Sequence, residues 1–243
     1  LSQAGIASRR KAVEIIESGK VEVNGQIVTE KGFAVNTAKD EILVSGKPIK
    51  STKNVYILLN KPKNCISAVT DPRFRKTVVD IARQQGVDAR IYPVGRLDKN
   101  TTGLLLLTND GELAFRLMHP KFGVTKTYEA TIKGVITHIE LEKLRRGLYV
   151  DGRKTSPAKA ELIFKDKVSS KVRLHIHEGR KHQVRLMLLT VGHPVTSLKR
   201  TRFGNLNLGT LKLGQSRLLS NGEIADLKEL VELLKADPRL PRH

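Results

Sequence analysis

The sequence has no tryptophan, only 4% aromatic residues and a single cysteine, Cys65. One cysteine excludes an internal disulfide and is typical of a reducing compartment, so we expect a cytoplasmic protein in which Cys65 is a buried structural thiol. No apolar stretch approaches the roughly 20 residues that cross a bilayer, which predicts no membrane association. The remaining composition, 39% hydrophobic and 28% charged, is typical of a folded globular chain.

Acidic residues are also scarce. The chain carries 24 Asp and Glu against 44 Lys and Arg, a formal net charge of +20. Such a surface attracts polyanions, because neutralising phosphates releases condensed counterions. Nucleic acid is therefore the favoured partner. Acidic lipid is a distant second, since no long basic amphipathic helix is visible.

Several familiar sites are missing from the sequence. We find no phosphate-binding Walker loop, no dinucleotide fingerprint and no paired-cysteine zinc pattern. The stretch "HIHEGRKH" raises the possibility of a metal site at His175, His177 and His182. The neighbouring Arg and Lys side chains would repel a cation, so RNA contact or simple exposure is favoured and we expect no metal.

The first fifty residues have the pattern of a small helix–hairpin unit. Ser8 is a candidate helix N-cap, an apolar stripe follows, and Gly19 is a suitable left-handed C-terminal stop. Asn24-Gly25 between alternating residues is a strong hairpin signal, because that turn requires positive φ. A second short strand pair is expected in "DEILVSGKPI".

Arg9, Arg10 and Lys11 fall in the first turn of this predicted helix. Cations there oppose the helix dipole, although the free N–H groups of the same turn favour phosphate. Solubility alone is the simpler explanation, but the unfavourable placement favours RNA contact.

Beyond a polar linker at residues 50–54, short strands outnumber helices and do not alternate with them regularly. We expect strands in "VYILLNKP", "KTYEATIKG" and "KVRLHIHEG", and helices in "RKHQVRLMLLTVG" and "NGEIADLKELVELL", the latter with Asn221 as a possible cap. This pattern predicts an α+β fold with a mixed sheet rather than a doubly wound fold. The expected domains are 1–50 and 51–243.

The best candidate for acid chemistry lies in "YPVGRLDKNTTGLLLL". Arg96 and Asp98 are two apart, so on an extended segment they project to the same side. A turn at Thr101-Thr102-Gly103 is expected before the leucines. The stretch alone is compatible with a structural ion pair or with a working carboxylate.

Two further segments could take part. Tyr128 is predicted on the apolar face of a strand, where it could stack on a base or belong to the core. "EGRKHQVRLM" places basic residues at a helix start, as a solvated face, a phosphate cradle or a guanidinium donor to a buried carboxylate.

The stretch "AGIASRRKAVEIIESGKVEVNGQIV" resembles an S4-type RNA-binding domain. The stretches "KPKNCISAVTDPRFRKTV", "YPVGRLDKNTTGLLLLTNDGELAFRLMHP", "KTYEATIKG", "EGRKHQVRLMLLTVGHPV" and "LKRTRFGNLNLGTLKLGQSRLL" resemble, in order, the ribosomal-RNA branch of the pseudouridine synthases. The resemblance spans nearly the whole chain and implies a small N-terminal RNA-binding domain followed by a mixed-sheet catalytic domain.

This resemblance implies isomerisation of a uridine inside ribosomal RNA by an enzyme of bacterial type. The bond between sugar and base nitrogen breaks, and the base is rejoined through carbon 5. No cofactor or metal is expected, since atoms and electrons balance. The implied partner is ribosomal RNA or a ribosomal subunit precursor, with large-subunit RNA mildly preferred, and a monomer is expected.

The resemblance also implies roles for individual residues. Asp98 is the essential carboxylate, which attacks the anomeric carbon or removes a neighbouring sugar proton. Tyr128 stacks under the flipped uracil and assists proton removal at carbon 5. Arg185 pairs with Asp98, with Arg180 as the fallback, and Arg96 helps to hold the base out of the helix. The expected RNA-binding residues are Arg9, Arg10, Lys11, Arg96, Arg180, Lys181 and His182.

Two other functions compete with pseudouridine formation. The charge and the N-terminal unit alone would suit a non-catalytic ribosomal-RNA-binding or ribosome-assembly protein. Such a binder has no need of Asp98, which RNA phosphate would repel. A metal-dependent nuclease would need a cluster of carboxylates that the sequence lacks.

Overall fold

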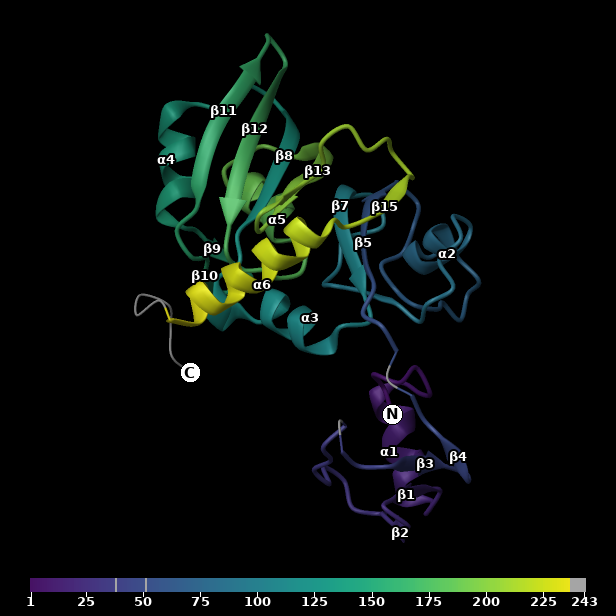
Figure 1. The fold of residues 1–243 in the computed structure, drawn as a ribbon. Helices are drawn as coiled ribbons and strands as arrows, with labels where there is room; N and C mark the ends of the chain where they lie inside the picture. Colours follow the sequence, from purple (N-terminus) through teal and green to yellow (C-terminus); the bar gives the residue numbers. More distant parts are fainter. Residues whose placement is uncertain (38, 51, 237–243) are drawn as a thin grey trace. The chain divides into compact units, whose positions relative to one another are not determined.

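The computed structural model describes residues 1–37, 39–50 and 52–236. The chain divides into two units, Leu1–Asn54 and Val55–His243, close to the boundary expected at residues 50 and 51. Figure 1 shows helices and strands in both units, with the large mixed sheet in the second. The predicted α+β fold class is confirmed.

The first unit contains one helix and a four-stranded sheet of order β2-β1-β3-β4. Its elements are α1 (Arg9–Glu17), β1 (Val21–Val23), β2 (Gln26–Ile27), β3 (Ile42–Val44) and β4 (Lys47–Pro48). Val21, Val23 and Val28 are buried under the apolar face of α1.

Local sequence accounts for the ends of these elements. The Ser8 hydroxyl accepts a hydrogen bond from the backbone N–H of Lys11 at 3.2 Å, which caps α1. Gly19 follows the helix with φ +69°, and Asn24-Gly25 have φ of +51° and +80° between β1 and β2. Both are left-handed positions that glycine and asparagine tolerate, so the predicted helix stop and hairpin turn are confirmed.

The second unit is built on a nine-stranded sheet. The central order is β11-β12-β8-β13-β7-β5-β15, with β14 paired to β13 and β6 paired to β7. Strands β13 and β7 are parallel, while the other pairs are antiparallel. The strands are β5 (Tyr56–Lys61), β6 (Tyr92–Pro93), β7 (Thr102–Thr108), β8 (Lys126–Lys133), β11 (Lys159–Lys165), β12 (Ser169–Ile176), β13 (Val195–Phe203), β14 (Leu206–Asn207) and β15 (Ser216–Leu218). A separate hairpin joins β9 (Tyr149–Val150) and β10 (Arg153–Lys154).

The leucine run Leu104–Leu107 forms the centre of β7 and is fully buried. Leu105 and Leu107 belong to one core cluster, and Leu104 and Leu106 to another. Successive side chains of a strand point to opposite faces, so this stretch of the sheet is covered on both sides. That is why the run is continuous rather than alternating.

The helices supply the two covers. The cluster of Leu105 and Leu107 includes residues of α2 (Val78–Arg83), α4 (His138–Arg146) and α5 (Gln183–Thr190). The cluster of Leu104 and Leu106 includes residues of α3 (Gly111–Met118), the 3₁₀ turn η1 (Pro120–Phe122) and α6 (Asn221–Ala236). The possible cap at Asn221 was wrong. Asn221 is the first helical residue, and Ser220 and Glu223 exchange the capping hydrogen bonds at 3.2 and 2.9 Å.

The predicted turn at Thr101-Thr102-Gly103 was also wrong, since Thr102 and Gly103 already belong to β7. Gly103 has φ +104°, and a Cβ there would lie 2.2 Å from the carbonyl oxygen of Arg200. The glycine is therefore needed for the close approach of β7 and β13, not for a turn.

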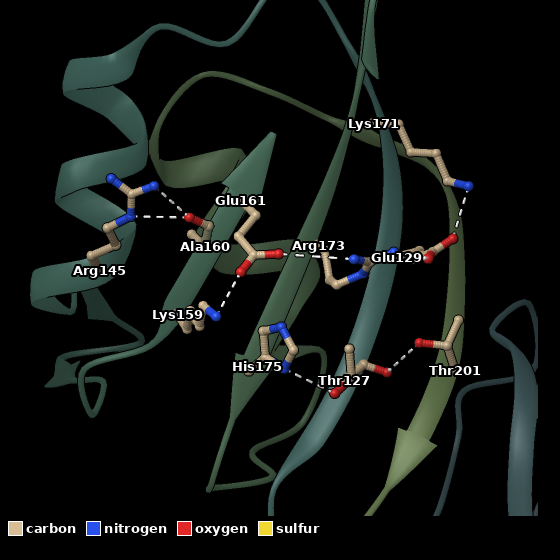
Figure 2. Close-up of polar contacts among 10 residues, drawn as sticks. All are labelled: Thr127, Glu129, Arg145, Lys159, Ala160, Glu161, Lys171, Arg173, His175 and Thr201. Atoms are coloured by element: carbon tan, nitrogen blue, oxygen red, sulfur yellow. Dashed lines mark hydrogen bonds and ion pairs between the residues drawn. The ribbon is translucent and has the colours of Figure 1, made fainter. Parts of the chain in front are cut away.

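On β8, β12, β13 and the first half of β11, one face packs on the core and the other is polar. Figure 2 shows this polar face, where Glu129 bonds Lys171 at 2.8 Å and Arg173 at 2.9 Å. Glu161 bonds Lys159 at 2.8 Å, and the His175 ring lies 3.0 Å from the Thr127 hydroxyl. The polar residues of this face therefore occupy the outward-pointing positions of the alternating strands.

Among the described residues, no helix combines the length and the apolar character needed to cross a membrane.

Candidate active site

A cavity of about 420 Å³ opens in the second unit beside the loop that joins β6 to β7. Its size lies within the range of small-ligand sites. The walls combine this loop with β8, β13 and the segment that leads into α5. The lining residues that matter to the chemistry are Arg96, Asp98, Lys126, Tyr128, Arg180, Lys181, His182 and Arg200.

Asp98 lies on the loop, with its side chain 37% exposed in the cavity. Its Oδ1 atom lies 3.4 Å from Nε2 of His182, the only ion-pair partner of Asp98 within the described residues. Arg96 lines the same cavity but is exposed and makes no ion pair with Asp98 in the described structure. The two side chains reach one cavity from a loop, not from the extended segment that we expected.

Lys61 anchors this loop from below. It is the last residue of β5, it is 0% exposed, and its ammonium lies 3.0–3.2 Å from the carbonyl oxygens of Pro62, Asp98, Lys99 and Thr101. Burial lowers the pKa of Lys61 to about 8. The lysine therefore fixes the backbone from Asp98 to Thr101, on the C-terminal side of the Asp98 side chain.

The Ser67 side chain holds the loop at Leu97, one residue before Asp98. Its hydroxyl donates to the carbonyl of Leu97 at 2.9 Å and accepts from the N–H of Leu97 at 3.1 Å. With the N–H of Thr101 bonded to the carbonyl of Asp98 at 3.0 Å, the loop has little freedom. Asp98 is thus held on a rigid backbone.

Tyr128 lies on β8 and is 9% exposed, with its ring in the cavity lining. Its cross-strand partners are Leu174 on β12 and Arg200 on β13. The predicted position of Tyr128 on the apolar face of a strand is confirmed, because Tyr128 belongs to the core together with Ala130 and Ile132 of the same strand. The ring therefore serves as core and as cavity wall together.

The predicted ion pair between Arg185 and Asp98 is absent from the described structure. Arg185 is on α5, but its guanidinium donates to the carbonyl of Val195 at 3.3 Å and does not line the cavity. Its neighbours Gln183 and Val184 do line the cavity. The structure places His182 against Asp98 instead.

The segment before α5 supplies the basic rim. Arg180 donates to the carbonyls of Arg153 and Lys154 at 3.2 and 2.6 Å and pairs with Glu178 at 3.1 Å. Lys181 and His182 are exposed at the cavity. The predicted cluster of Arg180, Lys181 and His182 is thus brought together with Asp98.

Other predicted residues lie elsewhere. Arg9, Arg10 and Lys11 are exposed in the first turn of α1, in the other unit, where Lys11 pairs with Glu14 at 2.7 Å. His175 contacts Thr127 and lies on the polar face of the sheet, apart from His182 in the cavity.

Cys65 is 1% exposed in the core, and burial raises the pKa of its thiol. A buried thiol with a raised pKa is a poor nucleophile. Its position suits the structural role that the sequence suggested.

Sequence reasoning missed four residues of this site: Lys61, Ser67, Lys126 and Arg200. A lysine that ends an otherwise apolar strand, as in "VYILLNK", was a visible signal for Lys61. Lys126 and Arg200 could not be singled out in a chain with 44 basic residues. Only their reduced exposure in the fold distinguishes them from the basic residues of the surface.

Comparisons with known proteins show the family to which this chain belongs. The profile of the family described as RNA pseudouridylate synthase matches residues 55–190, and that of the S4 domain matches residues 1–42. Ribosomal large subunit pseudouridine synthase B of Bacillus subtilis (strain 168) is 48% identical over 96% of this chain and 95% of its own length. An uncharacterized RNA pseudouridine synthase of Aquifex aeolicus (strain VF5) is 40% identical over 100% of this chain and 96% of its own length. A crystal structure of a pseudouridylate synthase, 30% identical, superposes with a TM-score of 0.67 over 93% of this chain and 95% of that one.

Proposed function

Because the chain belongs to the RNA pseudouridylate synthase family, we propose that it converts a specific uridine of ribosomal RNA, preferably of the large subunit, into pseudouridine. It is an isomerase acting on RNA. The name of the Bacillus subtilis relative supports the large-subunit choice. We extend the proposal to action in the cytoplasm, as a monomer, on ribosomal RNA or a subunit precursor.

The observation that carries the proposal is Asp98, held rigidly in a cavity beside Tyr128, inside the region that matches the family. The carboxylate acts on the ribose, either by attack on the anomeric carbon or by removal of a neighbouring proton. The bond from the anomeric carbon to N1 breaks and the bond to C5 forms. The C5 proton leaves, and N1 gains one, so the reaction needs no other reactant.

The other cavity residues serve this step. Tyr128 presents an aromatic face on which a flipped uracil stacks. Arg96, exposed at the cavity, holds the nucleotide out of the RNA helix, and Arg180, Lys181 and His182 bind the flanking backbone. Once RNA fills the cavity, Arg185 releases its hydrogen bond to the Val195 carbonyl and pairs with Asp98. A permanently charged guanidinium suits a working carboxylate better than an exposed imidazole does.

The test is tritium release from ribosomal RNA that carries uridine labelled at carbon 5. We expect release with the wild-type protein and none with Asp98→Asn, while RNA binding stays within about twofold, since the change removes one charge and no bulk. Mapping pseudouridines in RNA from cells with and without the protein then identifies the target. An active Asp98→Asn protein would exclude Asp98 as the essential group.

The second candidate function is a non-catalytic ribosomal-RNA-binding or ribosome-assembly protein, which the net charge of +20 favours. A wild-type protein that binds ribosomal RNA tightly but forms no pseudouridine, on naked RNA and on subunits alike, would establish that alternative.

A further inference from the structure

One buried and one partly buried basic side chain line the wall of the cavity, apart from the exposed basic rim. Arg200 on β13 is 2% exposed, and Lys126 is the first residue of β8. Both line the cavity together with Asp98 and Tyr128. No ion pair joins either of them to a carboxylate within the part of the chain that the structure describes.

The guanidinium of Arg200 is only partly satisfied by the protein. Its Nε donates to the carbonyl of Leu104 at 2.8 Å, and its Cζ lies 5.0 Å from the ring centroid of Phe203. Its Nη2 is buried and has no hydrogen-bond acceptor among the described residues. A buried guanidinium that lacks a counterion, and an acceptor for one of its nitrogens, is costly, so a ligand is expected to supply them.

Lys126 is partly buried and, like Arg200, has no ion pair with a carboxylate among the described residues. Its ammonium donates to the carbonyls of Val124 at 3.1 Å and His177 at 3.3 Å. Burial and the charge of Arg200 lower the pKa of Lys126 to about 8, while Glu178 opposes that shift. Glu178 is itself engaged by Arg180 and by the Gln183 amide, at 3.1 and 2.5 Å, so the two cations share no counterion of their own.

The fold holds the pair in place. Arg200 is the register partner of Tyr128 on β8 and of Gly103 on β7, the strand that follows the Asp98 loop. The missing side chain at Gly103 lets β7 press directly on the backbone of Arg200. The backbone of Arg200 is therefore fixed between β7, which follows the Asp98 loop, and β8, which carries Tyr128, as the support of a preorganised binding group would be.

The ligand that fits is an RNA phosphate. Uridine is neutral in its ground state, so the base would leave the positive charges of Arg200 and Lys126 without a counterion. A phosphodiester carries a permanent negative charge and several acceptor oxygens, and it arrives with the nucleotide. We propose that Lys126 and Arg200 form a phosphate-binding subsite that takes a backbone phosphate of the nucleotide entering the cavity.

This proposal rests on the proposed function only in requiring that RNA enters the cavity. Binding is therefore measured on the Asp98→Asn protein, with the fragment of ribosomal RNA that it binds most tightly, so that turnover does not matter. Neutral methylphosphonate linkages replace the loop phosphates of that RNA one at a time. Lys126→Met and Arg200→Gln are the test variants, and Lys181→Met, at the exposed rim, is the matched control.

At one phosphate we expect neutralisation to weaken binding by about tenfold, as for the loss of one charge-assisted hydrogen bond. Lys126→Met should weaken binding to unmodified RNA by a similar factor and should lose nothing more at that phosphate. Its salt slope should fall by about one unit. In the Lys181→Met protein, neutralising that same phosphate should still weaken binding by the full factor seen in the parent.

The subsite would be overturned if neutralising each phosphate weakened binding of the Lys126→Met protein as much as that of its parent. It would also be overturned if the variants bound unmodified RNA as tightly as their parent. An effect confined to the rate of pseudouridine formation in active-protein versions of the variants would assign the pair to the departing uracil instead. Should Arg200→Gln fail to fold, Lys126→Met decides alone. Failure of the proposed function shows separately, as absent tritium release by the wild-type protein.

Discussion

Lys61 illustrates how much of the site depends on a single buried side chain. Its ammonium lies 3.0–3.2 Å from four carbonyl oxygens, three of them on the segment Asp98–Thr101. The lysine does not line the cavity, so it acts through the loop and not on RNA. We regard it as a positioning residue for Asp98.

Replacing Lys61 with Met nearly keeps the length of the side chain but removes the ammonium donor from these four carbonyls. We expect a loss of about 3 kcal/mol in the free energy of unfolding. Loop displacement should also lower kcat by about 100-fold, even where the protein is fully folded. Urea unfolding and tritium release measure the two effects. Lys63→Met, on an exposed neighbour, should change neither; a stable and active Lys61→Met protein would refute the positioning role.

Arg185 and His182 compete as partners of Asp98. His182 makes the observed contact, but its side chain is 48% exposed and Asp98 is 37% exposed, so that pair is weak. We expect His182→Ala to lower kcat by less than about fivefold. Arg185→Ala should lower it by about 100-fold, as for the loss of a charged partner of the working carboxylate, with partial rescue by Arg185→Lys. Near-wild-type kcat for folded Arg185→Ala would leave His182 as the partner.

At the scale of the elements, the contact between β7 and β13 brings the chemistry together. Gly103→Ala should cost about 3–5 kcal/mol in unfolding free energy, because φ is +104° and the new Cβ would lie 2.2 Å from the Arg200 carbonyl. Gly86→Ala is the matched control, with φ +85° and no atom within 4 Å of the Cβ. It should cost about 1–2 kcal/mol from backbone strain alone. Equal losses in the two variants would argue against a tight β7–β13 approach.

At the scale of the whole molecule, the charge of +20 predicts RNA binding through both units. Arg9→Ala with Arg10→Ala should weaken binding to ribosomal RNA at low salt, because both side chains are exposed in the first turn of α1. The slope of log K against log salt should become shallower by about two units. Lys47→Ala with Lys50→Ala removes the same charge from the same unit and should change the slope less. An unchanged slope in the arginine variant would mean that the cluster only aids solubility.

The sequence predicted the features that depend on neighbouring residues. Ser8, Gly19 and Asn24-Gly25 specify a cap, a stop and a turn through their own backbone preferences, and alternation predicted the faces of β8 and β12. The errors at Thr102-Gly103 and Asn221 arose where a tertiary contact or an adjacent cap decided between two local readings. Gly103 looked like a turn residue because its neighbour, β13, lies some 97 positions further along the chain, as the register with Arg200 shows.

By itself, the sequence determined the fold class, the polyanionic partner and Asp98 as the candidate carboxylate, because periodicity, composition and a distinctive segment are properties of the linear chain. Only the tertiary structure decided that Lys61 holds the Asp98 loop and that His182 and not Arg185 contacts Asp98 in the free protein. It alone shows that Arg200 is buried, and Lys126 partly buried, in the cavity wall that Tyr128 also lines. These facts depend on strand register and burial. Burial changes a cation from a common surface group into one that needs a specific partner, and no linear pattern records it.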